Sequence, residues 1–200
     1  TGYVNLYNGD VVIARPLTQC GGNRMPVSIT AYYGVQLYGV TANMRAGWRL
    51  SCDQCMTKSY INDELYFIWS KGDGSQHYFR KPNSSAAYYE DLSGLSLKLT
   101  DNGTYTEIED KGGTVMRFES PQDALDDTGR LLSITDSCGN TNTFQYGDWR
   151  LESITDGAGR VTQFTYSGNM LTGILAPGES APVTLEYYNN RQLNGIVDAD

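Results

Sequence analysis

The chain has 200 residues and a formal net charge of −8, and its composition is rich in Gly and Tyr but poor in charged residues. Its 15 Lys and Arg are scattered, so the sequence lacks the basic patch by which proteins bind nucleic acid or anionic lipid. No stretch approaches the roughly 20 apolar residues of a membrane span, so we expect no nucleic-acid partner and no membrane insertion.

The first half is predicted to consist of strands and turns without an internal repeat. Asn8-Gly9 stands between two apolar stretches, which is a strong hairpin signal. Residues 26–33 alternate in the manner of a strand, and residues 47–51 predict another. No pattern of amphipathic helix stands out, so the fold class is expected to be all-β.

Cysteine and histidine are too few to predict a metal or redox centre. Cys52 and Cys55 form a single Cys-x-x-Cys, whereas a zinc ribbon needs a second pair. The simplest interpretation is that they flank a turn, either free or disulfide-bonded. His77 is the one histidine of the sequence, which limits both imidazole catalysis and imidazole ligation. We therefore expect no cofactor and no metal requirement for folding.

Degenerate hairpins are predicted from about residue 60 onward. Asp73-Gly74-Ser75 precedes Tyr78-Phe79, and Asp110-Lys111-Gly112-Gly113 precedes Phe118. An insert around residues 122–127 would account for the longer spacing between Asp110 and Asp136. The chain is accordingly divided into an N-terminal β region, residues 1–128, and a repeat region, residues 129–200.

The repeat region has a period of 20 residues. Each copy reads as a short strand, a turn with Asp and Gly, and a second strand with an aromatic pair, because Phe and Tyr two positions apart point to one face. Neighbouring hairpins are expected to stack these aromatic side chains as a ladder. The predicted structural repeat residues are Ile134, Asp136, Gly139, Phe144, Tyr146, Ile154, Asp156, Gly159, Phe164 and Tyr166. A looser third copy carries Leu185-x-Tyr187, and residues 196–198 begin a fourth.

These motifs resemble the YD repeat of Rhs proteins, of the shell subunits of insecticidal toxin complexes and of teneurins. The resemblance is carried by Ile-Thr-Asp-x-x-Gly followed by Phe-x-Tyr at residues 134–146 and 154–166, and by the opening segment Gly2-x-Val4-Asn5-Leu6-Tyr7. It covers most of residues 1–80 and 129–200. It implies antiparallel hairpin repeats in an open, curved sheet, as a fragment of a hollow β-shell. The plug and the self-cleaving aspartyl segment of full members are not found in this sequence.

The resemblance implies a structural role in a secreted or surface-delivered bacterial protein, as part of a shell that encapsulates a C-terminal toxin or polypeptide cargo. The implied partners are further YD repeats of a longer parent chain, with a toxin cargo or a glycan as candidates, and self-association through sheet edges is expected. The alternative function is a cell-surface adhesin or carbohydrate-binding module that uses its tyrosines. Those tyrosines are Tyr32, Tyr33, Tyr88, Tyr89, Tyr187 and Tyr188.

Catalytic and metal-site hypotheses are weaker, so the protein is not expected to be an enzyme. Asp136 and Asp156 recur with the turn, and Asp is a common turn residue because its side chain binds the following backbone. Calcium at Asp73 or at Asp101-Asn102-Gly103 would match neither an EF-hand loop nor an RTX repeat. Ser, His and Asp are present without a Gly-x-Ser-x-Gly elbow.

Overall fold

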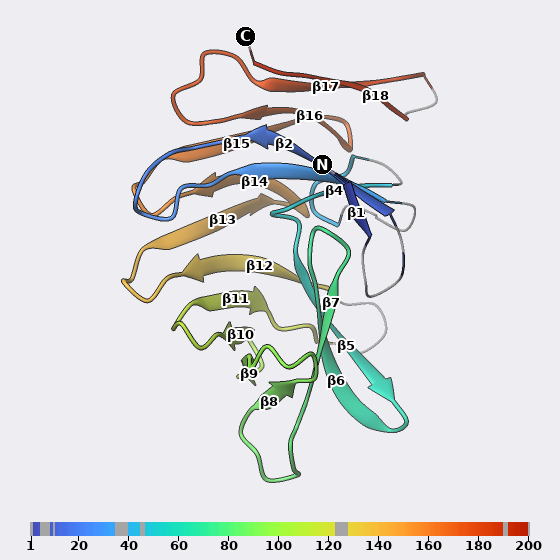
Figure 1. The fold of residues 1–200 in the computed structure, drawn as a ribbon, viewed down its shortest axis with the longest axis vertical. Helices are drawn as coiled ribbons and strands as arrows, with labels where there is room; N and C mark the ends of the chain where they lie inside the picture. The colour runs from blue at the N-terminus through green and yellow to red at the C-terminus, as the bar shows by residue number, and fades with distance from the viewer. Residues whose placement is uncertain are drawn as a thin grey trace. The chain divides into compact units, whose positions relative to one another are not determined.

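The computed structural model describes residues 2–4, 9, 11–34, 40–44, 47–122, 128–189 and 192–199. Within these ranges the chain forms β-strands and no helix, and every strand pairing is antiparallel, which confirms the predicted all-β class (Figure 1). No helix suited to crossing a membrane occurs in the described segments. The predicted Asn8-Gly9 turn and most of the insert at 122–127 involve residues outside them.

The chain divides into two compact units, each of which is described by itself. Unit 1 comprises Thr1–Asp53, Gly72–Gly74 and Asn142–Asp200, and unit 2 comprises Gln54–Lys71 and Ser75–Thr141. This division follows contacts in space, whereas the predicted boundary after residue 128 follows the sequence repeat. That boundary stays a prediction.

Unit 2 is an eight-stranded barrel. Its strands are β5 (Cys55–Ile61), β6 (Glu64–Ser70), β7 (Gln76–Arg80), β8 (Tyr89–Asp91), β9 (Lys98–Asp101), β10 (Tyr105–Glu109), β11 (Val115–Glu119) and β12 (Thr128–Thr135). Each pairs with the next, and β12 pairs back onto β5 with Thr128 opposite Thr57. The prediction of an open, curved sheet is therefore wrong for this part of the chain. Closure gives β5 and β12 a partner on both sides within the ring.

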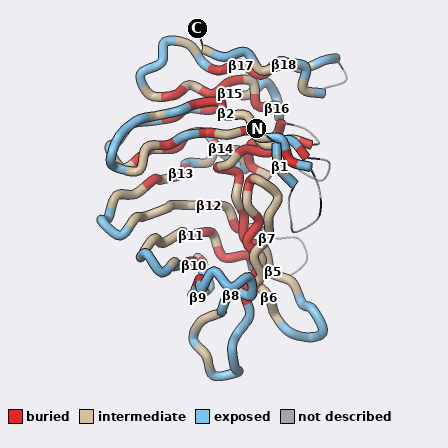
Figure 2. Tube along the Cα trace, viewed as in Figure 1, coloured by how far each residue is buried: buried red, intermediate tan, exposed pale blue. Residues whose placement is uncertain are grey.

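Figure 2 shows buried residues along the strands of the barrel, and many of them occupy alternate strand positions. The large apolar ones with no exposed surface are Met56, Phe67, Phe79, Leu99, Ile108, Phe118 and Leu131. Gly129 allows β12 to approach β11 closely, because a Cβ at this position would overlap the carbonyl oxygen of Glu119. Backbone proximity at this glycine thus helps the last strand to close the ring.

Unit 1 consists of two antiparallel sheets. The first contains β1 (Gly2–Val4), β2 (Val11–Thr18), β3 (Ile29–Tyr33) and β4 (Trp48–Leu50). The observed β3 and β4 confirm the strands predicted at 26–33 and 47–51. The second sheet contains the repeat strands β13 (Thr141–Gly147), β14 (Arg150–Thr155), β15 (Val161–Ser167), β16 (Met170–Leu175), β17 (Val183–Tyr187) and β18 (Leu193–Val197).

The two sheets of unit 1 face one another. Leu17 of β2 lines the same pocket as Ile174 of β16 and Val183 of β17. Buried apolar side chains come from both sheets, as expected of sheets packed over a common core. They include Val12, Ile29, Ala31 and Leu50 from the first sheet and Ile154, Phe164, Ile174 and Leu185 from the second.

Candidate functional site: the repeated hairpins and the segment that holds them

The repeated hairpins share one pairing pattern. Phe144 lies opposite Ile154 and Phe164 opposite Ile174, and the register then shifts by one residue, so that Tyr146 lies opposite Leu151. The same two pairs and the same shift recur in four hairpins. In order, the pairs are Met116–Ile134 and Phe118–Leu131, Phe144–Ile154 and Tyr146–Leu151, Phe164–Ile174 and Tyr166–Leu171, and Leu185–Ile196 and Tyr187–Leu193.

The first of these hairpins, β11–β12, is the degenerate copy predicted from Asp110, Phe118 and the insert at 122–127. Met116 stands where the later copies have Phe or Leu, and Phe118 stands where they have Tyr. Its two strands are also separated by the insert, which lengthens the spacing. The shared register and shift are the signals that place it with the others.

The predicted stacking of aromatic rings from neighbouring hairpins needs correction. Registers of β13–β14 and β14–β15 put Phe144, Ile154 and Phe164 on one face of the sheet. β14 intervenes between the two aromatic strands, and its Ile154 lies opposite Phe144. Phenylalanine and isoleucine therefore alternate across the sheet. Phe144 and Phe164 are both buried, while Tyr146 and Tyr166 are half-buried.

The predicted turn residues Asp136 and Asp156 begin two identical five-residue turns. Asp136 Oδ1 accepts hydrogen bonds from the backbone N–H groups of Cys138 and Asn140, both at 2.9 Å. Asp156 Oδ1 accepts the equivalent bonds from Ala158 and Arg160. Gly139 and Gly159 have φ of +83° and +80°, a left-handed conformation that glycine adopts without a steric penalty.

A third copy of this turn lies upstream at Asp110. Its Oδ1 accepts hydrogen bonds from the N–H groups of Gly112 and Thr114, and Gly113 has φ of +82°. After β16 the corresponding position is Ala176, which has no side-chain acceptor, and the looser proline-containing loop follows. The Asp turn therefore marks three successive boundaries, at Asp110, Asp136 and Asp156.

The turn carboxylates are held in their charged form by these bonds. The side-chain and backbone hydrogen bonds from Asn140 lower the pKa of Asp136. Burial raises the pKa of Asp156, but the backbone and side-chain hydrogen bonds from Arg160 outweigh it, so that the net shift is downward. Arg160 Nη2 lies 2.7 Å from Asp156 Oδ2. Each carboxylate thus serves its own turn, which is a structural use.

Tyrosines of the repeat bind the preceding hairpin. The hydroxyl of Tyr166 donates to the carbonyl of Leu151 at 2.7 Å, and that of Tyr187 donates to the carbonyl of Leu171 at 2.6 Å. Burial raises the pKa of Tyr166, with a smaller contribution from nearby Asp53. The phenol therefore stays protonated and remains a donor.

Residues 41–43 supply the second bond to the same two leucines. The N–H of Leu151 donates to the carbonyl of Thr41 and the N–H of Leu171 to the carbonyl of Asn43, both at 3.0 Å. Leu151 and Leu171 thus have their backbone groups satisfied by one tyrosine and one carbonyl of this segment. We call this arrangement the leucine socket.

A buried aspartate that the sequence interpretation missed holds the segment in place. Asp53 has no exposed surface and accepts hydrogen bonds from Val40 N–H at 2.7 Å and from Thr41 N–H and Oγ1, both at 2.9 Å. Arg49 Nε donates to the Asp53 carbonyl at 2.8 Å and lies 3.9 Å from its carboxylate. The sequence predicts a turn between Cys52 and Cys55, and no local signal marks Asp53 as buried.

All four cysteines are free thiols. This resolves the alternatives left open for Cys52 and Cys55, both of which are buried. Burial raises the pKa of the Cys52 thiol well above its ordinary range. Such a thiol stays protonated and is a poor nucleophile or metal ligand.

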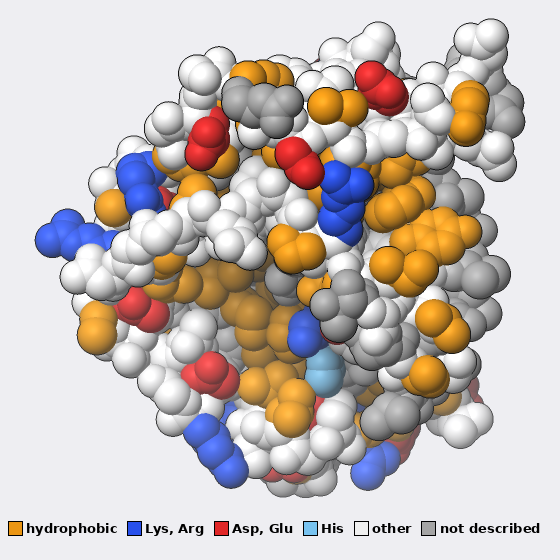
Figure 3. All heavy atoms as spheres, turned by 45° about the horizontal axis from the view of Figure 1, so that its top comes forward, with side chains coloured by type: hydrophobic (Ala, Val, Ile, Leu, Met, Phe, Trp, Pro, Cys, Tyr) orange, Lys and Arg blue, Asp and Glu red, His pale blue; other side chains and the backbone are white. Residues whose placement is uncertain are grey.

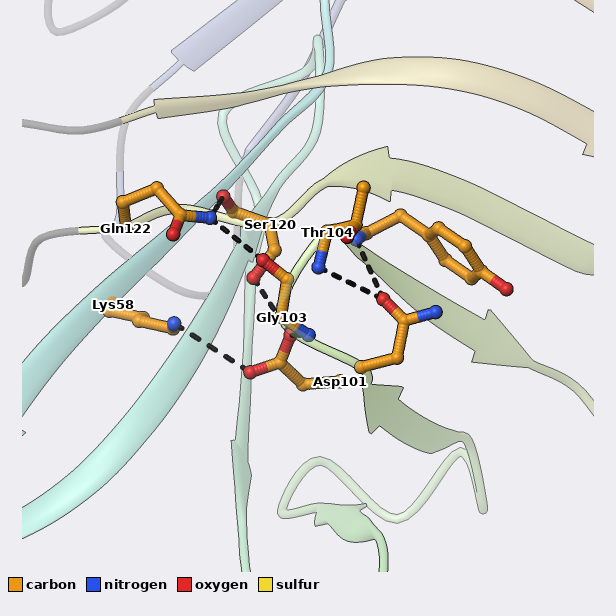
Figure 4. Close-up of polar contacts among 8 residues, drawn as sticks. Lys58, Asp101, Gly103, Thr104, Ser120 and Gln122 are labelled. Atoms are coloured by element: carbon orange, nitrogen blue, oxygen red, sulfur yellow. Dashed lines mark hydrogen bonds and ion pairs between the residues drawn. The ribbon is translucent and has the colours of Figure 1, made fainter.

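The barrel contains an ion pair between strands four apart in its ring of eight (Figure 4). Lys58 Nζ of β5 lies 3.6 Å from Asp101 Oδ2 of β9. Asp101 Oδ1 also accepts hydrogen bonds from Ser120 Oγ at 2.7 Å and Gly103 N–H at 3.0 Å. Asn102 Oδ1 accepts from the next turn residues, including Thr104. The side-chain oxygens at the calcium candidate Asp101-Asn102-Gly103 are thus bound by hydrogen-bond donors of the chain itself.

Serine, histidine and aspartate do meet in unit 2, without the geometry of a catalytic triad. His77 Nδ1 lies 3.1 Å from Ser93 Oγ and 3.8 Å from Asp91 Oδ1. A triad needs serine and carboxylate at different ring nitrogens, whereas here both address Nδ1. Asp91 also accepts hydrogen bonds from the N–H groups of Ser93 and Leu95, so this cluster shapes the loop after β8. Among the described residues, no three His, Cys, Asp or Glu side chains form a cluster suited to a metal ion.

Charged side chains of both signs are interspersed on the face that Figure 3 shows. Comparison with family models finds no matching family, and comparison with curated proteins finds no match. The candidate site of this chain is therefore defined by its own geometry, which is a set of equivalent hairpins joined by Asp turns and leucine sockets.

Proposed function

We propose that this chain is a structural module of a secreted or surface YD-repeat protein and forms part of a β-shell that encapsulates a C-terminal toxin or polypeptide cargo. The observation that carries the proposal is the leucine socket. The hydroxyl of Tyr166 binds the carbonyl of Leu151 in the preceding hairpin, and the hydroxyl of Tyr187 binds the carbonyl of Leu171 in the same way. The same hydrogen bond between successive hairpins therefore occurs twice. Such a bond lets hairpins be added one after another, as a wall requires.

The edge strand β18 supports the same proposal. Leu193 lies opposite Tyr187, as Leu171 lies opposite Tyr166. In the described part of the chain, β18 pairs with β17 alone, and no tyrosine hydroxyl binds the carbonyl of Leu193. A further hairpin with a tyrosine at the matching position would bind that carbonyl and cover this edge.

The alternative function, a cell-surface adhesin or carbohydrate-binding module, rests on exposed tyrosines. Tyr33 and Tyr188 are 41% and 58% exposed. Tyr187, by contrast, is engaged in a leucine socket. Fewer of the six tyrosines are thus free for a ligand than the sequence alone suggested, and the wall function is preferred.

Limited proteolysis of the full-length parent protein tests encapsulation. If these hairpins are shell wall, a segment downstream of the repeats should resist protease while the shell is folded and become sensitive once the shell is opened by denaturant. Equal sensitivity of that segment in both states would contradict the encapsulation function. The Asp53→Ala variant, which releases the segment at 41–43, should open the shell at lower denaturant concentration.

A further inference from the structure

A pocket of about 560 Å³ opens in unit 2 beside β6, β7 and the loop that follows β7. Its volume lies within the roughly 300–1,000 Å³ of small-molecule sites. Its lining combines Leu65, Pro82 and the ring of Tyr89 with polar residues of β6, β7 and the loop after β7. Neither the repeats nor the leucine sockets involve these residues.

The lining of this pocket is rich in hydrogen-bond donors. Arg80, Lys81, Asn83 and Ser84 all line it. Asn83 Oδ1 is already engaged, because it accepts hydrogen bonds from the N–H and the hydroxyl of Ser85. The Asn83 amide group therefore has only donors to offer a ligand.

The charge of the pocket is opposite to that of the chain. Two cations and one acid, Glu64, line it, in a chain whose formal net charge is −8. Glu64 Oε2 lies 3.3 Å from Arg80 Nη1 and is thus paired. Among the residues that the structure describes, no carboxylate lies within ion-pair distance of Lys81, whose ammonium stands 5.6 Å from the centre of the Tyr89 ring. One positive charge is left for a ligand.

We propose that this pocket binds a carboxylated sugar, of the hexuronate class. A carboxylate would pair with Lys81, because Arg80 already pairs with Glu64, and charge-assisted bonds of this kind are the strong ones. The hydroxyl groups would accept from Asn83 and Ser84. The apolar C–H face of the pyranose ring would lie against Tyr89 and Leu65, since aromatic side chains combine an apolar body with a polar tip.

Isothermal titration calorimetry of the whole 200-residue chain with sodium glucuronate tests the proposal. We expect saturable binding at millimolar or lower concentration, and at least about tenfold weaker binding of glucose, which lacks the carboxylate. Lys81→Gln should weaken glucuronate binding by about tenfold or more through loss of the ion pair. Amide shifts caused by glucuronate should centre on residues 80–89.

A matched control is provided by Lys98, whose ammonium stands 5.4 Å from the centre of the Tyr88 ring, away from this pocket. Lys98→Gln removes the same charge and should leave the affinity unchanged. Three outcomes would overturn the proposal: no saturable heat with glucuronate, equal affinity for glucose and glucuronate, or equal weakening by Lys81→Gln and Lys98→Gln. The site is independent of the wall function, so either can fail without the other.

Discussion

The barrel of unit 2 and the repeat sheet of unit 1 use the same hairpin in different ways. In the barrel, hairpin β11–β12 is followed in the ring by β5, so each of its strands is paired on both sides within the ring. In the repeat sheet, the last described hairpin, β17–β18, ends with a strand paired on one side. One hairpin pairing pattern therefore occurs both in a closed ring and in a sheet that ends in an edge strand.

The difference lies in what surrounds the hairpin. Strands β5 to β10 pair without the register shift that the four hairpins share, and β5 supplies the partner that closes the ring. The repeat strands of unit 1 are instead held by residues 41–43, which bind alternate strands through Leu151 and Leu171. Within the described residues, the edge strand β18 pairs with β17 alone, which leaves its other side available to another hairpin.

The largest effects are expected from truncation of the buried aromatic residues of the hairpins. Phe164→Ala in the repeat sheet and Phe118→Ala in the barrel should each lower the free energy of unfolding by about 3–5 kcal/mol, because both side chains are buried. Urea denaturation monitored by tryptophan fluorescence and by circular dichroism measures this. A loss below about 1 kcal/mol at Phe164 would mean that the repeat sheet has no packed core.

Smaller losses of stability are expected from substituting one glycine in each unit. Gly129→Ala should destabilise the barrel by about 1–3 kcal/mol or more, because the new Cβ would overlap the Glu119 carbonyl. Gly159→Ala should cost about 1–2 kcal/mol through its left-handed φ of +80° alone, since no atom lies within 4 Å of the new Cβ. Thermal melts of both variants test this order, and a costlier Gly159→Ala would contradict it.

Acid should weaken the Asp turns of both units. The pKa values of Asp110, Asp136 and Asp156 lie below the ordinary value of 3.8 in the folded chain. Their contribution to stability is therefore present above pH 3.8 and is lost as the pH falls through the lower folded values. Urea melts between pH 7 and pH 2.5 should show this loss, and Asp156→Asn should make it smaller. Stability that rises on acidification below pH 3.8 would contradict the lowered pKa values.

The turns of this structure could be predicted from the sequence, whereas the pairing of strands far apart in the chain could not. Turn residues such as Asp136 and Gly139 act through their own backbone, so spacing and residue type sufficed to predict them. Barrel closure depends on the pairing of Thr57 with Thr128, far apart in sequence, which no local periodicity encodes. The role of Asp53 depends likewise on a segment folded over it, and its surroundings in the sequence resemble an ordinary turn.

The open edge should also promote weak self-association. Val197 of β18 is 47% exposed, and an edge strand with unpaired backbone groups invites pairing with another chain. Light scattering at several protein concentrations should show a mass that rises with concentration, and Val197→Lys should reduce the rise. A strictly monomeric mass throughout would indicate that β18 is protected in solution.

The most direct test of the wall function is to add a hairpin. A copy of β15–β16, residues 156–175, fused after Asp200 should pair with β18, and its tyrosine should bind the carbonyl of Leu193. We predict a melting temperature raised by at least about 3 °C, since 1 kcal/mol corresponds to about 2–4 °C in a chain of this size. A smaller rise is expected when the added tyrosine is phenylalanine. An unchanged melting temperature, with amide exchange in the added hairpin as fast as in a free peptide, would contradict the proposal that β18 accepts a further repeat.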